Sequence, residues 1–138
     1  MDSAGRQADD EAGRCRVLIV EDNPDTASML ALAVVRGGHD AQTARNGTEA
    51  IVVAGSYKPH AMLVDIGLPG VDGLYVVREI RNTDSDLLII AATGRSSPED
   101  IQRFREAGCD HHLVKPIDLD ALAAILGEWK SRRGCLTA

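Results

Sequence analysis

The stretch His60-Ala-Met-Leu-Val-Asp-Ile-Gly-Leu-Pro-Gly-Val-Asp-Gly73 decides how the rest of the chain is interpreted. Its short apolar run, Ala61 to Val64, is typical of a buried strand, and it ends in the carboxylate of Asp65. Residues typical of a loop follow, and Asp72 is placed to cap the next helix. Ligands of open α/β sheets bind beyond the carboxyl ends of the strands, so Asp65 has the position of a functional residue. A carboxylate that only caps a turn is the alternative at this point.

Segments with strand and helix patterns alternate on both sides of this stretch. Besides the run that ends at Asp65, strands are predicted at 16–20, 39–44, 87–92 and 110–114. The segment 39–44 is polar, which predicts a place at the edge of a sheet. Helices are predicted from Pro24 to the Gly37-Gly38 stop, from Asn46 to about Ser56, from about Asp72 to Asn82, from Ser97 to the Gly108 stop, and from Asp118 through Trp129. This alternation predicts an α/β fold, in which helices cover both faces of a parallel sheet.

Apolar residues that recur at helical spacing predict the buried face of each helix. Helix by helix, the residues predicted to face inward are Met29, Leu30, Ala33 and Val34; Ala50, Ile51 and Ala54; Leu74, Val77 and Ile80; Ile101, Phe104 and Ala107; and Leu122, Ile125, Leu126 and Trp129. Aromatic residues make up only 3% of the chain, so the core must be built mainly from Val, Leu, Ile and Ala. Such a composition is typical of a parallel sheet that is buried on both faces.

Length and charge limit the class of protein. The 138 residues fit one domain, which we place at 15–131, with flexible tails at 1–14 and 132–138. The net charge of −6 argues against direct nucleic-acid binding, which favours basic surfaces. No apolar run approaches the roughly 20 residues that span a bilayer, and the polar N-terminus is not a signal peptide. We therefore expect neither nucleic-acid contact nor membrane insertion.

The three cysteines, Cys15, Cys109 and Cys135, are widely spaced and odd in number. They form no CxxC motif, and their spacing predicts no disulfide framework. The cytoplasm, a reducing compartment, is the simplest setting for such a chain.

Chemically useful side chains follow four of the five predicted strands, namely Glu21 and Asp22, Asp65, Thr93, and Lys115. Because parallel strands end at one edge of the sheet, these residues are expected to converge in one crevice. Three carboxylates there would repel one another unless a cation neutralised them, and Mg2+ suits a site with few protein carboxylates. An ammonium and a hydroxyl beside the ion suit a phosphoryl group, and an Asp can accept that group as an aspartyl-phosphate. Each residue alone also has a structural explanation, as a solvated helix approach, a loop hydroxyl or a surface lysine, and only their common position favours the functional one.

Several of these segments together resemble the receiver domain of response regulators in two-component signalling. The matching segments are Val17-Leu-Ile-Val-Glu-Asp-Asn23, Asn46-Gly-Thr-Glu-Ala50, Leu63-Val-Asp-Ile-Gly-Leu-Pro-Gly-Val-Asp-Gly73, Ala92-Thr-Gly94, Gly108-Cys-Asp110 and Leu113-Val-Lys-Pro-Ile117. They extend from about residue 15 to residue 130, and their combination is far more specific than any one of them. The resemblance implies a flavodoxin-like fold with five parallel strands in the order 2-1-3-4-5.

The resemblance also implies roles for individual residues. Asp65 would be the phosphoacceptor, and the side-chain amine of Lys115 would pair with the phosphoryl group. The peptide bond between Lys115 and Pro116 would be cis. The implied Mg2+ ligands are Glu21 and Asp22, Asp65 itself, and the backbone carbonyl of Gly67. The phosphoryl group would come from a histidine kinase or a histidine phosphotransfer protein. Beyond self-phosphorylation and autodephosphorylation, no enzymatic activity is expected.

Members of this family switch when they are phosphorylated. The resemblance implies that the Thr93 hydroxyl moves toward the phosphoryl oxygens and that a side chain of the fifth strand follows it. This change would reshape a surface formed by the fourth helix, fifth strand and last helix, to which a downstream protein target binds. The strand-five position is His112, where the family more often has Tyr or Phe, so we expect switching to be pH-sensitive or partly uncoupled. Gly67 and Arg95 occupy the positions that tune water attack on the acyl phosphate, and we expect Arg95 to affect the phosphoryl lifetime.

Three other readings remain open from the sequence. A pseudo-receiver would act as an interaction module without phosphorylation, although every acidic, Thr and Lys position is filled. A phosphatase of the haloacid-dehalogenase kind would need a second Asp two residues after the nucleophile, where this chain has Gly67. A dinucleotide binder would need a glycine-rich turn after the first strand, where Glu21 and Asp22 stand instead. The sequence also leaves open how the receiver would pass on its signal, since a free-standing receiver, a phosphoryl relay carrier and a piece of a larger regulator all fit. Met1 and the charged N-terminal tail favour an independent product.

Overall fold

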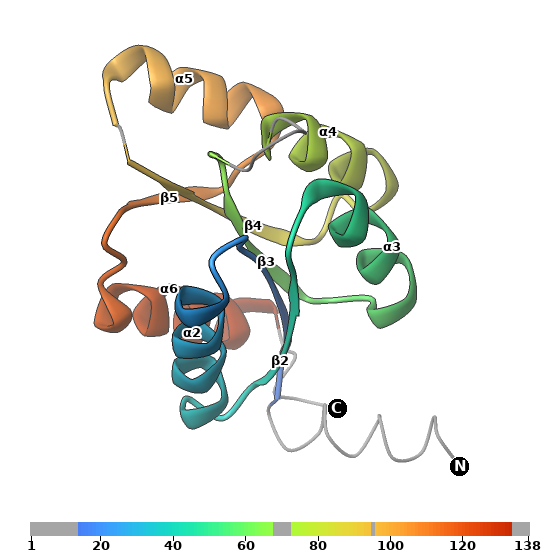
Figure 1. Ribbon diagram of the computed structural model, residues 1–138, viewed down its shortest axis with the longest axis vertical. Helices are drawn as coiled ribbons and strands as arrows, with labels where there is room; N and C mark the ends of the chain where they lie inside the picture. The colour runs from blue at the N-terminus through green and yellow to red at the C-terminus, as the bar shows by residue number, and fades with distance from the viewer. Residues whose placement is uncertain (1–13, 68–72, 95, 134–138) are drawn as a thin grey trace.

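The computed structural model describes residues 14–67, 73–94 and 96–133, and these form one sheet covered by helices (Figure 1). Its strands are β1 (Arg16–Val20), β2 (Asp40–Ala44), β3 (Ala61–Asp65), β4 (Leu88–Thr93) and β5 (His111–Val114). Its helices are α2 (Pro24–Arg36), α3 (Gly47–Tyr57), α4 (Gly73–Thr83), α5 (Pro98–Ala107) and α6 (Leu119–Arg133). All paired strands are parallel and lie in the order β2-β1-β3-β4-β5. The predicted α/β fold, its strand order and the edge position of the polar second strand are confirmed.

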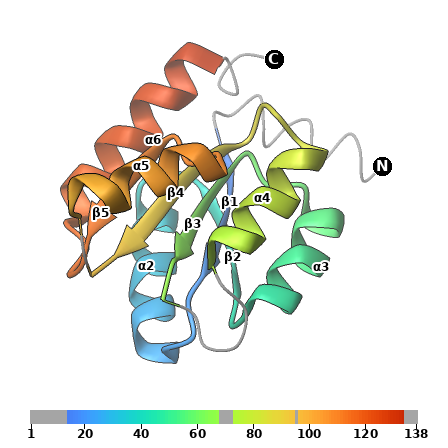
Figure 2. The same cartoon turned by 90° about the horizontal axis from the view of Figure 1, so that it is seen from above.

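Alternating side chains of the central strands supply two separate cores, one on each face of the sheet. One face carries Leu18 and Val20 of β1 with Met62 and Val64 of β3, beneath α3, α4 and α5. The opposite face packs against α2 and α6, and Figure 2 shows these two helices on the other side of the sheet. Its strand residues are Val17, Ile19, Ala61, Leu63, Leu88, Ile90 and Ala92. Because β1, β3 and β4 are covered on both faces, their apolar runs are nearly continuous.

Two residues that were predicted to face inward lie at the surface instead. Met29 is 48% exposed and Ile51 is 37% exposed. In α2 the buried positions are Ala27, Leu30 and Val34, one turn or two turns apart, and Met29 lies about 100° around the helix from Leu30. In α3 the buried positions are Gly47 and Ala50, with Val53, Ala54 and Tyr57 packed against the same core, and Ile51 lies about 100° around the helix from Ala50.

The last helix runs to Arg133, so the start of the predicted C-terminal tail, 132–138, is helical. The predicted tail at 1–14 overlaps the described residues only at Arg14, whose guanidinium lies 3.3 Å from the Asp40 carboxylate. The remaining tail residues, together with Asp72 and Arg95, lie outside the described residues. Among the helices that are described, none has the length and apolar character needed to cross a membrane.

The cysteines differ from the sequence expectation. Cys15, which is 1% exposed beside β1, is disulfide-bonded, so the expectation of a chain without disulfides is wrong. Cys109 is a free thiol, and burial raises its pKa to about 12, which leaves almost no reactive thiolate at neutral pH. The cysteines therefore give no support for a reducing compartment.

His39 is a buried histidine in the seam between α2 and α6. Its side chain is 6% exposed, and its Nδ1 atom has no hydrogen-bond partner within residues 14–67, 73–94 and 96–133. Burial lowers the pKa of the imidazole, the nearby Lys130 ammonium lowers it further, and the Asp40 carboxylate opposes the change. The folded protein therefore holds His39 in its neutral form.

We expect this histidine to destabilise the fold in acid. Its pKa is lower in the folded chain than the usual value near 6.5, so the unfolded chain binds the proton first as the pH falls. The contribution of neutral His39 to the free energy of unfolding is therefore fully present above about pH 6.5. Below that pH the free energy of unfolding decreases by at most about 1.4 kcal/mol per pH unit. Urea unfolding of the wild type and His39→Phe between pH 5 and pH 8 measures this slope. A variant that loses stability in acid as steeply as the wild type would contradict it.

Candidate functional site

The predicted site residues lie at the carboxyl-terminal edge of the sheet. Glu21 and Asp22 directly follow β1, Asp65 and Thr93 end β3 and β4, and Lys115 directly follows β5. The backbone hydrogen bonds continue past the strand ends. The Glu21 N–H donates to Ala44 O at 2.9 Å, and the Lys115 N–H donates to Thr93 O at 2.8 Å. The sheet therefore holds the backbone of these residues directly.

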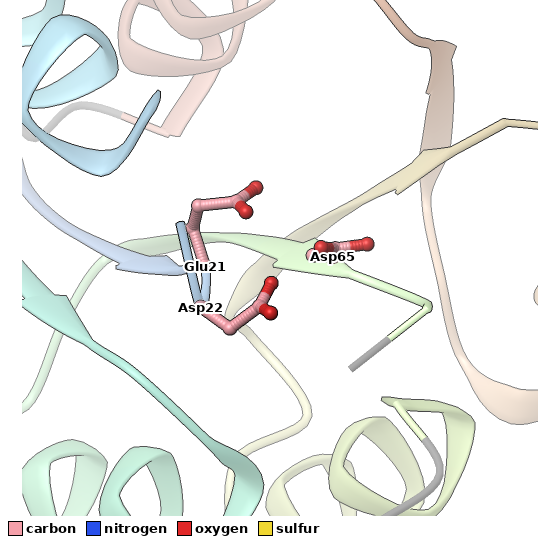
Figure 3. A group of neighbouring side chains, drawn as sticks. All are labelled: Glu21, Asp22 and Asp65. Carbon is pink, nitrogen blue, oxygen red and sulfur yellow. The ribbon is translucent and has the colours of Figure 1, made fainter. Parts of the chain in front are cut away.

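Three carboxylates form one cluster, drawn side by side at the ends of β1 and β3 in Figure 3. One oxygen from each of Glu21, Asp22 and Asp65 lies within 4.8 Å of the other two. Glu21 and Asp65 are buried, at 5% and 4% exposure, whereas Asp22 is open to solvent. Two oxygens that bind one Mg2+ at about 2.1 Å are at most about 4.2 Å apart. The donor set therefore fits Mg2+ after a closure of about half an ångström, or with one carboxylate bound through water.

Lys115 brings a positive charge against this cluster. Its Nζ lies 2.9 Å from Asp65 Oδ2 and 3.8 Å from Glu21 Oε1. One ammonium beside three carboxylates leaves an excess of negative charge in a largely buried place, which a divalent cation would balance. The Lys115 amine thus contacts the Asp65 carboxylate directly, at the place where a phosphoryl group on Asp65 would be attached.

Backbone amides orient the two buried carboxylates. The N–H of Asn23 donates to Glu21 Oε2 at 3.1 Å, and the N–H of Gly67 donates to Asp65 Oδ1 at 2.9 Å. The pKa of Glu21 is raised overall. Burial is the largest cause and the charge of Asp65 adds to it, whereas the Asn23 hydrogen bond opposes the change. In each carboxylate, one oxygen thus accepts a backbone hydrogen bond and the other faces the Lys115 ammonium.

Thr93 and His112 lie on the same face of the sheet. Thr93 is buried at 6% exposure and alternates with Ile89 and Ala91, which face α5. His112 pairs with Ala91 across the strands, and its ring centroid is 6.3 Å from that of Phe104 in α5. This is the arrangement that a coupled movement of the two side chains would require.

His111 points to the opposite face from His112, because it pairs with Ile90 of the other core. The two side chains therefore point away from each other and cannot bind one metal ion together. The peptide bond between Lys115 and Pro116 is cis, as the resemblance implied.

Sequence reasoning assigned no role to two residues that the structure places against the site. Asn23 caps α2, and its backbone N–H also donates to Glu21 Oε2. Gly73 begins α4 directly beneath the backbone of Asp65 and Ile66. The available signal was a glycine at the first position of a predicted helix, where most other residues would favour the helix more.

Residues 17–127 match the family described as the response regulator receiver domain. The chain belongs to this family. The receiver domain is similar to the transcriptional regulatory protein PrrA of Mycobacterium tuberculosis, with 37% identity over 119 residues, which is 86% of this chain and 51% of PrrA. It is also similar to the response regulator MprA of Mycobacterium avium, with 34% identity, covering 79% of this chain and 48% of MprA. The chain thus spans about half the length of these curated relatives.

Solved structures support the same fold. A two-component response regulator from Clostridium difficile is 26% identical, with a TM-score of 0.83 over 87% of this chain and 98% of that chain. The receiver domain of the Francisella response regulator 1452 has a TM-score of 0.81 over 87% of this chain and 99% of that chain, and at 22% identity it shows the fold alone. The family and the fold are those of a signalling receiver domain. Receiver domains generally bind Mg2+ at an acidic pocket, and the carboxylate cluster of this chain has that chemistry.

Proposed function

We propose that Asp65 accepts a phosphoryl group from a histidine kinase or a histidine phosphotransfer protein, with Mg2+ bound by Glu21, Asp22, Asp65 and the carbonyl of Gly67. The observation that carries the proposal is the 2.9 Å contact between Lys115 Nζ and the Asp65 carboxylate inside the three-carboxylate cluster. An acid beside a cation site supplies the nucleophile, and the amine balances charge on the transferred oxygens. Bound Mg2+ would neutralise the phosphoryl oxygens during transfer.

Incubation with acetyl phosphate and Mg2+, followed by the intact mass of the protein, tests this proposal. The wild type should gain the mass of one phosphoryl group, and removal of Mg2+ with a chelator should prevent the gain. A protein that keeps its unmodified mass with Mg2+ present would favour the alternative, a pseudo-receiver that binds partners without phosphorylation. Pull-downs with each form would then identify the downstream protein target.

Phosphorylation would act through Thr93 and His112 on the surface formed by α5, β5 and α6. Both side chains lie on the face of the sheet that α5 covers, which supports a coupled movement. Arg95 and Gly67 would tune the lifetime of the phosphoryl group, through water access to Asp65. We place the protein in the cytoplasm, where response regulators typically act, and we propose no direct contact of this domain with nucleic acid.

We expect His112 to weaken the coupling between phosphorylation and β5. Its imidazole is smaller than the Tyr or Phe ring that the family more often has there, and it lies beside Phe104 of α5 with 6.3 Å between the ring centroids. The change in the amide NMR signals of β5 on phosphorylation should therefore be smaller in the wild type than in His112→Tyr. Equal changes in the two proteins would contradict the expectation.

A further inference from the structure

The backbone leaving the proposed phosphoacceptor passes unusually close to Gly73, the buried first residue of α4. A Cβ atom at Gly73 would lie 2.8 Å from Ile66 Cα, 2.9 Å from the Asp65 carbonyl oxygen and 3.0 Å from the Ile66 carbonyl oxygen. All three neighbours are backbone atoms, so no side chain can rotate away to make room. Only glycine fits between α4 and the end of β3.

Both sides of this contact are held in place. The Ile66 N–H donates to Ala92 O at 2.9 Å, which ties the end of β3 to β4. On the other side, α4 is fixed by its apolar face, where Leu74, Val76 and Val77 are at most 1% exposed. A side chain at position 73 would therefore push on the segment between these two anchors, which is the backbone at 65–67.

This segment carries the groups that define the site. The Gly67 N–H holds Asp65 Oδ1 at 2.9 Å, and Asp65 Oδ2 meets Lys115 Nζ at 2.9 Å. We infer that Gly73 is a positioning residue, whose missing side chain lets the 65–67 backbone present the Asp65 carboxylate and the Gly67 carbonyl to the cation and the phosphoryl donor. This inference rests on the proposed function, because it concerns the same site.

The size of the effect follows from the distances. Ordinary contacts of a Cβ atom begin at about 3.4 Å, so the backbone must move by about half an ångström. A misplacement of about 1 Å in a reacting group can cost about a hundredfold in rate. We expect Gly73→Ala to lower the rate of phosphorylation by acetyl phosphate at least tenfold and to raise the half-saturating Mg2+ concentration several-fold.

Gly94→Ala is the matched control. Gly94 directly follows Thr93 at the same edge of the sheet, yet a Cβ atom there meets no atom of the described residues within 4 Å. Both substitutions are best made in a Gly127→Ala background, because a Cβ at Gly127 in α6 also meets no described atom within 4 Å and alanine favours a helix over glycine. The added helix stability should offset part of the cost of the overlap at Gly73.

The expected result is a cooperatively folded Gly73→Ala protein with the rate and Mg2+ changes given above and displaced amide NMR signals at Ile66 and Gly67. The Gly94→Ala protein should stay within twofold of its parent. Equal rates and equal Ile66 signals in the two variants would overturn the inference, as would complete unfolding of Gly73→Ala, since the residue would then serve folding alone. If the parent itself takes up no phosphoryl group, the proposed function fails, and the amide signals and the Mg2+ titration still decide the role of Gly73.

Discussion

We expect an Asp65→Asn protein to take up no phosphoryl group from acetyl phosphate and Mg2+, whereas the wild type should gain the mass of one. The amide of Asn is a poor nucleophile, and it lacks the negative charge that helps to hold a divalent cation. We expect the rate of phosphorylation to fall by more than a hundredfold, to below detection by intact mass. The amide keeps the size of the carboxylate and can still accept the Gly67 hydrogen bond, so the fold should persist.

The control for this prediction is Asp25→Asn. Asp25 is an exposed acid in the first turn of α2, close in sequence to the site but outside the carboxylate cluster. Its substitution removes the same charge and should leave phosphorylation within twofold of the wild type. Phosphorylation of Asp65→Asn at the normal rate would show that another residue is modified, and the assignment of the phosphoacceptor would be lost. Peptide mapping of the wild-type adduct would then identify that residue.

The strand ends were predictable because parallel strands leave little freedom at their carboxyl edge. Once 16–20, 61–64 and 87–92 were read as neighbouring buried strands, Glu21, Asp65 and Thr93 had to follow them at one rim. The alternation of side chains along β5 also places His112 and His111 on opposite faces of the sheet. These results need only the period of a strand and the order of the sheet.

Details that depend on the distance between elements could not be read from the chain. The close approach of Gly73 to Ile66 arises from how deeply α4 packs, and no local pattern encodes that depth. The error at Ile51 has another origin, because helical spacing alone does not show which of two adjacent apolar residues, Ala50 or Ile51, faces the sheet. The disulfide at Cys15 was missed because wide, odd spacing gives no framework to recognise.

Arg81 holds together three segments at the edge of the sheet opposite to the site. Its guanidinium donates to Gly108 O at 2.7 Å, Leu87 O at 2.6 Å, Ser85 O at 3.0 Å and the Asp110 carboxylate at 2.8 Å. These acceptors belong to the approach to β4 and to the turn between α5 and β5, so one side chain of α4 joins them. Three of the acceptors are backbone carbonyl oxygens.

Arg81→Ala should lower the free energy of unfolding by about 2–4 kcal/mol, because it leaves several carbonyl groups without a donor in a partly buried place. Urea unfolding measures this change. Arg78→Ala is the control, since Arg78 is exposed on the same helix, and it should change stability by less than about 0.5 kcal/mol. Arg81→Lys should recover only a small part of the loss, because one ammonium cannot reproduce the planar fork that reaches all these acceptors. If Arg81→Ala and Arg78→Ala unfold at the same urea concentration, the hydrogen bonds of Arg81 do not hold these segments together.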